Sequence, residues 1–92
     1  MTTRTVTVVN VLGMHARAAA RFVRLASSFV SQVRVNREDR VIDGKSIMGL
    51  LLLAAARGTT IQISADGADE QAAVDALAGL VESGFGEDVC SA

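Results

Sequence analysis

The sequence predicts an α+β fold: an open-faced β-sandwich in which three helices cover one face of a four-stranded antiparallel sheet. Three observations lead to this fold class. Short runs rich in Val, Ile and Thr alternate with segments whose apolar residues recur every three or four positions. The order of these segments is β-α-β-β-α-β-α. The 92 residues, which contain no Pro and no long linker, suffice for a single domain spanning residues 1–92.

The first half of the chain supplies three strands and one helix. Residues 4–10, "RTVTVVN", predict a strand, and Gly13 then predicts a turn. A helical period starts at Ala16, and its apolar face is formed by Ala19, Phe22, Val23, Ala26 and Phe29. Residues 31–37 and 40–43 predict a hairpin that buries Val33 and Val35.

The second half supplies two helices and one strand. Ser46 is expected to cap a helix built from the apolar run 47–56, with Gly58 closing it. Residues 59–65 alternate and predict a strand that buries Ile61 and Ile63. The last helix is expected from about Asp69 to Glu82, and "SGFGED" ends it. Its predicted inward residues are Ala73, Ala76, Leu77, Leu80 and Val81.

Composition excludes several classes of function. Only three residues are aromatic, all of them Phe, so the stacking platforms of a nucleic-acid-binding protein are missing. The start of the chain lacks a signal-peptide pattern, and its longest apolar run is far shorter than the ~20 residues that span a bilayer. The single cysteine, Cys90, cannot form an internal disulfide, which favours the cytoplasm. With one His and a remote Cys, neither a metal site nor a cofactor is expected.

Charge is distributed unevenly along the chain. Residues 1–37 hold six Arg and no acid, whereas residues 58–92 hold seven acids and no Lys or Arg. One interpretation is that the basic segment attracts anions or acidic partners. The alternative is that these are ordinary surface charges, and that the two ends of the sequence meet in the fold.

The only histidine, His15, lies immediately before the first predicted helix. A helix N-terminus offers unpaired N–H groups to an anion, and Arg17 adds a planar donor suited to phosphate oxygens. A cation in the first turn costs roughly 0.3–1 kcal/mol unless something negative compensates it. Because imidazole is a good phosphoryl acceptor, the pattern indicates a phosphorylated histidine. The alternative is an ordinary histidine, with Arg21 and Arg24 on the solvent face of the helix.

A second candidate site is "GKS", residues 44–46. It is not a phosphate-binding P-loop, because that motif needs Gly at the position of Asp39. Ser46 is a helix cap and also a candidate phosphorylation site, since a phosphate at a helix N-terminus is tolerated. The apolar residues that follow are either core or an exposed docking surface for a partner. They are Ile47, Met48 and Leu51.

Three segments together resemble a known family. They are "GMHARAA" (13–19), "GKSIMGLL" (44–51) and "SADGADEQAAVDAL" (64–77). In order and spacing they are similar to HPr, the histidine-containing phosphocarriers of the bacterial phosphotransferase system, and the resemblance spans about residues 3–88. It implies that His15 is phosphorylated on Nδ1 by phospho-Enzyme I, which is charged by phosphoenolpyruvate. The phosphoryl group then passes to the A component of a sugar permease or a nitrogen-related system.

The resemblance also assigns roles to neighbouring residues. It implies that the Ala16 and Arg17 amides and the Arg17 side chain hold the phosphate. It implies that HPr kinase/phosphorylase modifies Ser46 from ATP. It further implies a partner-docking surface, to which we assign Arg21, Arg24, Ile47, Met48 and Leu51. A protein of this kind is a carrier on which other enzymes act, and is not itself an enzyme.

Some residues depart from the family pattern. Ala18 stands where the family usually has Pro, so we expect an intact site with a looser start of the helix. Leu12, Met14 and the ending "SGFGED" lean toward the nitrogen-related branch, NPr, whereas "GKSIMG" leans toward HPr under kinase control. Two other functions stay open at this point. One is a regulatory module that docks through residues 47–51 with little phosphotransfer, and the other is a small-molecule-binding domain.

Overall fold

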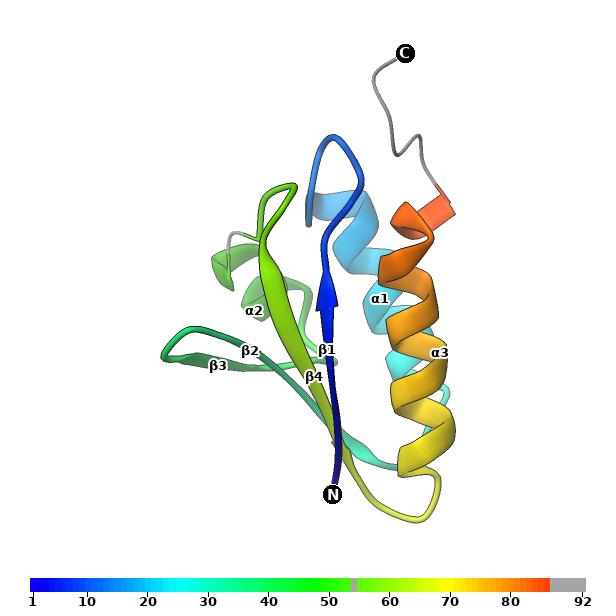
Figure 1. Cartoon of the computed structure of the whole chain (residues 1–92). Helices are drawn as coiled ribbons and strands as arrows, with labels where there is room; N and C mark the ends of the chain where they lie inside the picture. The colour runs from blue at the N-terminus through cyan, green and yellow to red at the C-terminus, as the bar shows by residue number, and fades with distance from the viewer. Residues whose placement is uncertain (54, 87–92) are drawn as a thin grey trace.

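The computed structural model describes residues 1–53 and 55–86 and has the predicted α+β architecture. Four antiparallel strands form one sheet in the order β1-β4-β2-β3, and the helices lie against one of its faces (Figure 1). The elements are β1 (Thr2–Thr7), α1 (Ala16–Ser27), β2 (Gln32–Arg37), β3 (Arg40–Asp43), α2 (Ile47–Leu53), β4 (Thr60–Asp66), α3 (Glu70–Glu82) and the 3-10 turn η1 (Gly84–Gly86).

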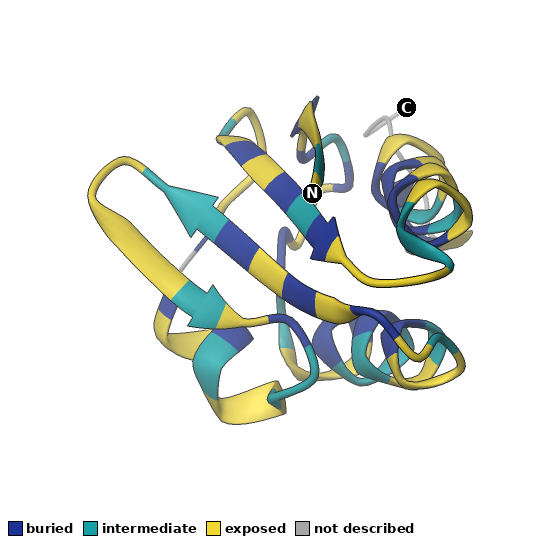
Figure 2. Ribbon diagram, turned by 90° about the horizontal axis from the view of Figure 1, so that it is seen from below, coloured by how far each residue is buried: buried dark blue, intermediate teal, exposed yellow. Residues whose placement is uncertain are grey.

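Alternation of side chains along the strands builds the core. Val35 pairs with Ile63 across β2 and β4, and Val6 pairs with Ile61 across β1 and β4. All four side chains are buried beneath the helices, whereas the residues between them are mostly exposed on the open face. Figure 2 shows this two-residue period as alternating bands along the strands. The strand predictions for residues 31–37, 40–43 and 59–65 are therefore confirmed to within a residue or so.

The two long helices bury most of the predicted apolar faces. In α1, Ala19, Phe22 and Ala26 are fully buried, and Val23 packs against the core. Helix α3 buries a different set of residues from the one predicted, because it packs on β1, β4 and α1 together. Its buried residues are Ala73, Val74, Leu77, Ala78 and Val81, whereas the predicted inward residues Ala76 and Leu80 are only half-buried.

The prediction that Gly58 closes the second helix is wrong, since α2 ends at Leu53. Ala55, beyond the end of α2, is buried against the loop before α1. The Ala55 carbonyl accepts a hydrogen bond from the Met14 amide of that loop at 2.9 Å. Gly58, with φ 88°, instead makes the turn into β4.

The first strand also ends earlier than predicted, at Thr7 and not at residue 10. Val8 still exchanges backbone hydrogen bonds with the turn before β4, accepting from Gly58 N–H at 2.7 Å and donating to Thr59 at 2.9 Å. Beyond Val8 the chain leaves the sheet and forms the loop that leads to His15.

Two arginines of the β2–β3 hairpin hold the C-terminus of α2. Arg37 donates to the carbonyl of Leu53, and Arg40 donates to that of Leu52, each at 3.0 Å. The last carbonyls of a helix lack partners within it, and cations are favourable there. The hairpin therefore fixes the position of this short helix, a contact that the sequence analysis did not foresee.

The chain after α3 turns through η1, in which Phe85 is buried with φ 58°. The predicted ending "SGFGED" is described as far as Gly86, so Glu87, Asp88 and Cys90 lie outside the described residues. Within residues 1–53 and 55–86, no helix is both long and apolar enough to cross a membrane.

Candidate functional site

The loop before α1 is held so tightly that only glycine fits at position 13. Gly13 has φ +65°, and a Cβ there would lie 2.7 Å from the Ala55 carbonyl oxygen. The Asn10 side-chain amide donates to the Gly13 carbonyl at 2.8 Å, and the His15 amide donates to the same oxygen at 2.9 Å. Buried Met14 anchors the loop beside them. The backbone therefore delivers His15 to one defined place at the start of α1.

His15 is the N-cap of α1. Its backbone is extended (φ −78°, ψ 177°), and its carbonyl accepts the first helical bond from Ala19 N–H at 2.8 Å. Its side-chain Nδ1 accepts a hydrogen bond from the Arg17 amide, with N···N 3.3 Å. A nitrogen that accepts a hydrogen bond is unprotonated, so Nδ1 carries the lone pair needed for nucleophilic attack. The half-buried ring thus holds Nδ1 beside the N-terminus of α1, where N–H groups without helical partners can bind an anion.

No acidic residue lies in the first turn of α1, where Ala16 and Arg17 are exposed. Within residues 1–53 and 55–86, the Arg17 guanidinium forms no ion pair. The positive end of the helix dipole, the free helical N–H groups and the Arg17 guanidinium are therefore not neutralised by that part of the chain. This arrangement favours an anion at His15.

The other basic residues of the first half have different surroundings. Arg4 pairs with Glu82 at 3.0 Å and with Asp75 at 3.7 Å, so the two ends of the sequence do meet in the fold. Arg21 is half-buried, and its guanidinium donates to the Phe85 carbonyl in η1. Arg24 is exposed on the last turn of α1. Part of the Arg21 donor capacity is thus used within the fold, whereas that of Arg24 faces solvent.

Ser46 caps α2 as predicted. Its hydroxyl oxygen accepts from Gly49 N–H at 3.0 Å, and its carbonyl accepts from Leu50 N–H at 3.1 Å. The hydroxyl itself is half-buried at the end of the helix. Ser46 therefore stabilises α2 whether or not it is modified.

The residues after Ser46 divide into a core side and a solvent side. Leu50 and Leu53 are buried, whereas Ile47, Met48 and Leu51 are 43%, 67% and 38% exposed. Two further exposed residues, Leu52 at 64% and Leu12 at 71%, were not predicted from the sequence. Four consecutive leucines could have signalled the first, because one helix face cannot bury all of them. We call the exposed residues Ile47, Met48, Leu51 and Leu52 the α2 apolar patch.

No group of three or more His, Cys, Asp or Glu side chains able to hold a metal gathers within residues 1–53 and 55–86.

Comparison with known proteins agrees with this geometry. A family model described as the PTS HPr component phosphorylation site matches residues 2–83. The chain belongs to the HPr family of phosphocarriers of the bacterial phosphotransferase system. A phosphocarrier protein HPr from Cupriavidus necator is 51% identical over 87 residues, which are 95% of this chain and 98% of that protein.

Related proteins also support the fold and bear on the branch of the family. The crystal structure of HPr-C-His from Thermoanaerobacter tengcongensis superimposes with a TM-score of 0.92 at 43% identity, covering 96% of this chain and 99% of that one. A phosphocarrier protein NPr from Shewanella violacea is 39% identical over 91% of this chain and 92% of its own length. The chain is thus more similar to the HPr of Cupriavidus than to this NPr.

Proposed function

We propose that this HPr-family protein accepts a phosphoryl group on Nδ1 of His15 from phospho-Enzyme I and passes it to an A component of a phosphotransferase system. The observation that carries the proposal is the hydrogen bond from Arg17 N–H to Nδ1 of His15, at the acid-free N-terminus of α1. This hydrogen bond supports Nδ1 as the nucleophile and places a donor beside the group that this nitrogen would receive.

The transfer is a displacement at phosphorus. The lone pair of Nδ1 forms the new N–P bond, the bond from phosphorus to the donor nitrogen of Enzyme I breaks, and its electron pair stays on that donor. The proton on Nε2 is not moved. The phosphoryl oxygens then replace the Nδ1 lone pair as acceptors for the Arg17 amide, and the Arg17 guanidinium neutralises part of their charge. Transfer to the A component is the same displacement with His15 as the leaving group.

Partner docking is assigned to the surface around this centre. The α2 apolar patch offers exposed hydrophobic area, and Arg21 and Arg24 of α1 add positive charge. A complementary partner surface is therefore partly apolar and partly acidic. We place the reaction in the cytoplasm, as the lone Cys90 predicts.

Regulation is assigned to Ser46, with HPr kinase/phosphorylase as the modifying enzyme. A phosphate on this hydroxyl adds about −1.5 to −2 charges next to Ile47 and Met48. A partner that buries the α2 apolar patch would then have to desolvate that charge. The helix N-terminus tolerates the phosphate itself, so the effect falls on docking and the fold is preserved.

The experiment is incubation with Enzyme I and phosphoenolpyruvate, followed by intact mass measurement. We expect a gain of one phosphoryl group that is labile in acid, and no gain for His15→Ala. His15→Ala should keep a cooperative thermal unfolding transition, because the ring is only half-buried. A wild-type protein that gains no mass would favour the alternative function, a regulatory module that docks through the α2 apolar patch. Acid-labile phosphate retained in His15→Ala would rule out His15 as the acceptor.

A further inference from the structure

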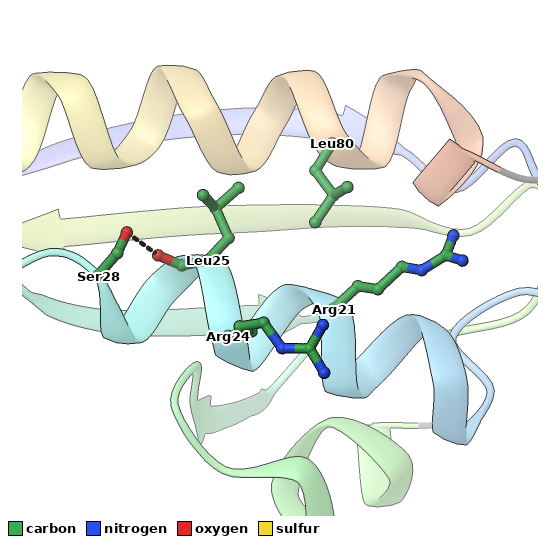
Figure 3. A pocket seen from close by; sticks show the side chains of 5 residues that line it. All are labelled: Arg21, Arg24, Leu25, Ser28 and Leu80. Carbon is green, nitrogen blue, oxygen red and sulfur yellow. Dashed lines mark hydrogen bonds between the residues drawn. The ribbon is translucent and has the colours of Figure 1, made fainter.

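A polar hollow lies on the open face of the sheet, on the side away from the helices (Figure 1). It is separate from the groove between α1 and α3 (Figure 3), whose Arg21 and Arg24 belong to the docking surface assigned above. The hollow has a volume of about 270 Å³. We call it the open-face hollow, and it is lined by Thr5, Asn36, Glu38, Thr60 and Gln62.

The register of the sheet brings these side chains together. Gln62 of β4 is paired with Thr5 of β1 on one side and with Asn36 of β2 on the other. The neighbouring residue Ile61 is buried beneath the helices, so this row of polar side chains points to the opposite face. Glu38, in the turn between β2 and β3, adds a carboxylate to the lining.

Glu38 is the one charged residue among the described residues that line the hollow. Its carboxylate forms no ion pair within residues 1–53 and 55–86. The arginines of the same hairpin, Arg37 and Arg40, donate to carbonyls at the end of α2. Arg34 stands one row further along the open face, opposite Asp43. The charge of Glu38 therefore favours a ligand of positive charge.

The amide groups of the hollow can accept a further hydrogen bond. The Asn36 Nδ2 donates to the Gln62 Oε1 at 3.3 Å, whereas the Asn36 Oδ1 is buried and has no partner within the described part of the chain. An unpaired buried acceptor is unfavourable, so rotation of this amide toward an entering donor would be stabilising. The hydroxyl groups of Thr5 and Thr60 can accept or donate.

We propose that the open-face hollow binds a small hydrophilic amine in its protonated form. The ammonium group, with three donors and a positive charge, contacts Glu38. Hydroxyl groups of the ligand contact the row formed by Thr5, Gln62 and Asn36. The volume lies below the range of about 300–1,000 Å³ for drug-sized ligands, which suits a ligand of few atoms.

Other ligand classes fit the lining less well. Calcium takes about six to eight oxygen ligands and is usually held by several carboxylates, whereas Glu38 supplies one. A flat ring would need an aromatic side chain to stack on, and none lines the hollow. An anion would be repelled by Glu38.

The inference does not depend on the phosphoryl chemistry at His15. The two sites attract opposite charges, since His15 and Arg17 lie at the positive end of the α1 dipole and the hollow contains a carboxylate. His15→Ala should therefore bind the amine as tightly as the wild type does. A protein that fails to accept phosphate can still show amine binding, and the reverse also holds.

The test is a titration of the ¹⁵N-labelled protein with 2-amino-1,3-propanediol at pH 7 and constant ionic strength. The side-chain NH₂ signals of Asn36 and Gln62 and the backbone amide of Thr5 should shift saturably. We expect a dissociation constant of about 10 mM or lower, which suits so few atoms. Glycerol has a hydroxyl in place of the ammonium, and isopropylamine lacks both hydroxyls. Each should bind at least about threefold more weakly.

Two variants and one matched control sharpen the test. Glu38→Gln keeps the shape of the side chain without its charge, and it should weaken binding about tenfold. Thr5→Val removes a hydroxyl at a strand position that Val also favours, and it should weaken binding about twofold. Asp39→Asn removes the neighbouring exposed acid, which does not line the hollow, and should leave binding unchanged. Thermal melts report whether each variant is folded.

Several outcomes would overturn the proposal. Equal affinity in Glu38→Gln and the wild type would exclude the carboxylate from the site. An equal loss in Asp39→Asn would reduce the effect to general attraction by acidic surface. Glycerol that binds as tightly as the amine would exclude an ammonium site. Shifts confined to the amides of Asp75 and Glu82 would place the cation on α3.

Discussion

The N-termini of α1 and α3 differ in the charged residues placed beside them. At α3, the Asp69 carboxylate accepts hydrogen bonds from Val30 N–H at 2.9 Å and from Ser31 N–H at 3.0 Å, and also from the Ser31 hydroxyl. Glu70 accepts from Gly67 N–H at 3.3 Å. At α1 there is no acid in the first turn, and a histidine stands at the cap.

The first two residues of the chain also contact the N-terminus of α3. Glu70 accepts from the Thr2 hydroxyl at 2.5 Å and pairs with the Met1 ammonium at 3.1 Å. The hydrogen bond from Ser31 lowers the pKa of Asp69, and the one from Thr2 lowers the pKa of Glu70. The hydrogen bond to Glu70 and the charge of that carboxylate raise the pKa of the Met1 ammonium.

This difference indicates which helix N-terminus is available to a negatively charged ligand. The α3 N-terminus receives its negative charge from Asp69 and Glu70 and serves the fold. The α1 N-terminus lacks such a residue and presents Arg17, which is unfavourable for the isolated helix by roughly 0.3–1 kcal/mol. A phosphoryl group on His15 would supply the missing charge, so stability is given up at the α1 end in favour of transfer.

Copying the α3 N-terminus onto α1 should have the largest effect on transfer short of removing His15. Ala16→Glu places a carboxylate at the first helical position, as Glu70 is placed in α3. We expect the free energy of unfolding to rise by about 0.3–1 kcal/mol. The rate of phosphorylation by Enzyme I should fall by about 100-fold, because the new charge competes with the phosphoryl group. Urea unfolding and single-turnover kinetics measure the two effects.

Ala16→Gln is the control for that substitution, since it has the same shape without the charge. It should retain most of the transfer rate. A rate as low as that of Ala16→Glu would mean that size, and not charge, disturbs the site.

Removing the Arg17 guanidinium should slow transfer by about 10- to 100-fold, the range expected for one charge-assisted hydrogen bond. Arg17→Ala should also make the folded protein slightly more stable, because a cation leaves the positive end of the helix dipole. The measurement is the rate of phosphorylation at several ionic strengths, beside a thermal melt. A wild-type rate would show that the backbone amides alone hold the phosphate.

A negative charge at Ser46 should slow transfer by about tenfold while the fold is kept. Ser46→Asp retains a capping acceptor for Gly49 N–H and puts charge beside the α2 apolar patch. The expected melting temperature is unchanged or slightly higher. Ser46→Ala is the matched control: it should transfer normally but lose about 0.5–2 kcal/mol of stability with the cap. An unchanged rate in Ser46→Asp would leave Ser46 as a cap only.

A substitution at the N-terminus of α3 should lower the stability of the fold and leave the rate of phosphoryl transfer unchanged. Asp69→Asn should lower the melting temperature by several degrees at pH 7, because the amide cannot accept both backbone hydrogen bonds and the one from Ser31 as a carboxylate does. The pKa of Asp69 is lower in the folded protein than its ordinary value of 3.8, so the ionised carboxylate stabilises the fold above pH 3.8. This stabilisation is lost as the pH falls through the folded-state pKa. The deficit of Asp69→Asn should therefore shrink below about pH 4.

Thermal melts from pH 2 to 8 measure that deficit. The phosphorylation rate of Asp69→Asn at a temperature where it is fully folded should match wild type. A slower rate would show that the N-termini of α1 and α3 are coupled, and it would contradict the separate roles given to them here.

Local patterns were sufficient to predict the strands, the cap at Ser46 and the position of His15, since each depends on neighbouring residues. Residues brought together from distant positions were not predictable in this way. Asp69 stands at the start of the predicted last helix, but its side chain makes no cap hydrogen bond and binds Ser31, 38 positions earlier. Arg21 likewise reaches Phe85 across 64 positions. Periodicity indicates which face is buried, but not which polar group meets another across the fold.

We propose above all that the α1 N-terminus holds the phosphoryl group through the Arg17 amide. The most direct measurement is the ¹H–¹⁵N spectrum before and after phosphorylation by Enzyme I and phosphoenolpyruvate, with a long-range ¹⁵N spectrum of the His15 ring. We predict phosphorus on Nδ1, the largest downfield shift in α1 at the Arg17 amide, and unmoved Glu70 and Ala73 amides in α3. Phosphorus on Nε2, or an Arg17 amide that moves no more than the rest of α1, would contradict the claim.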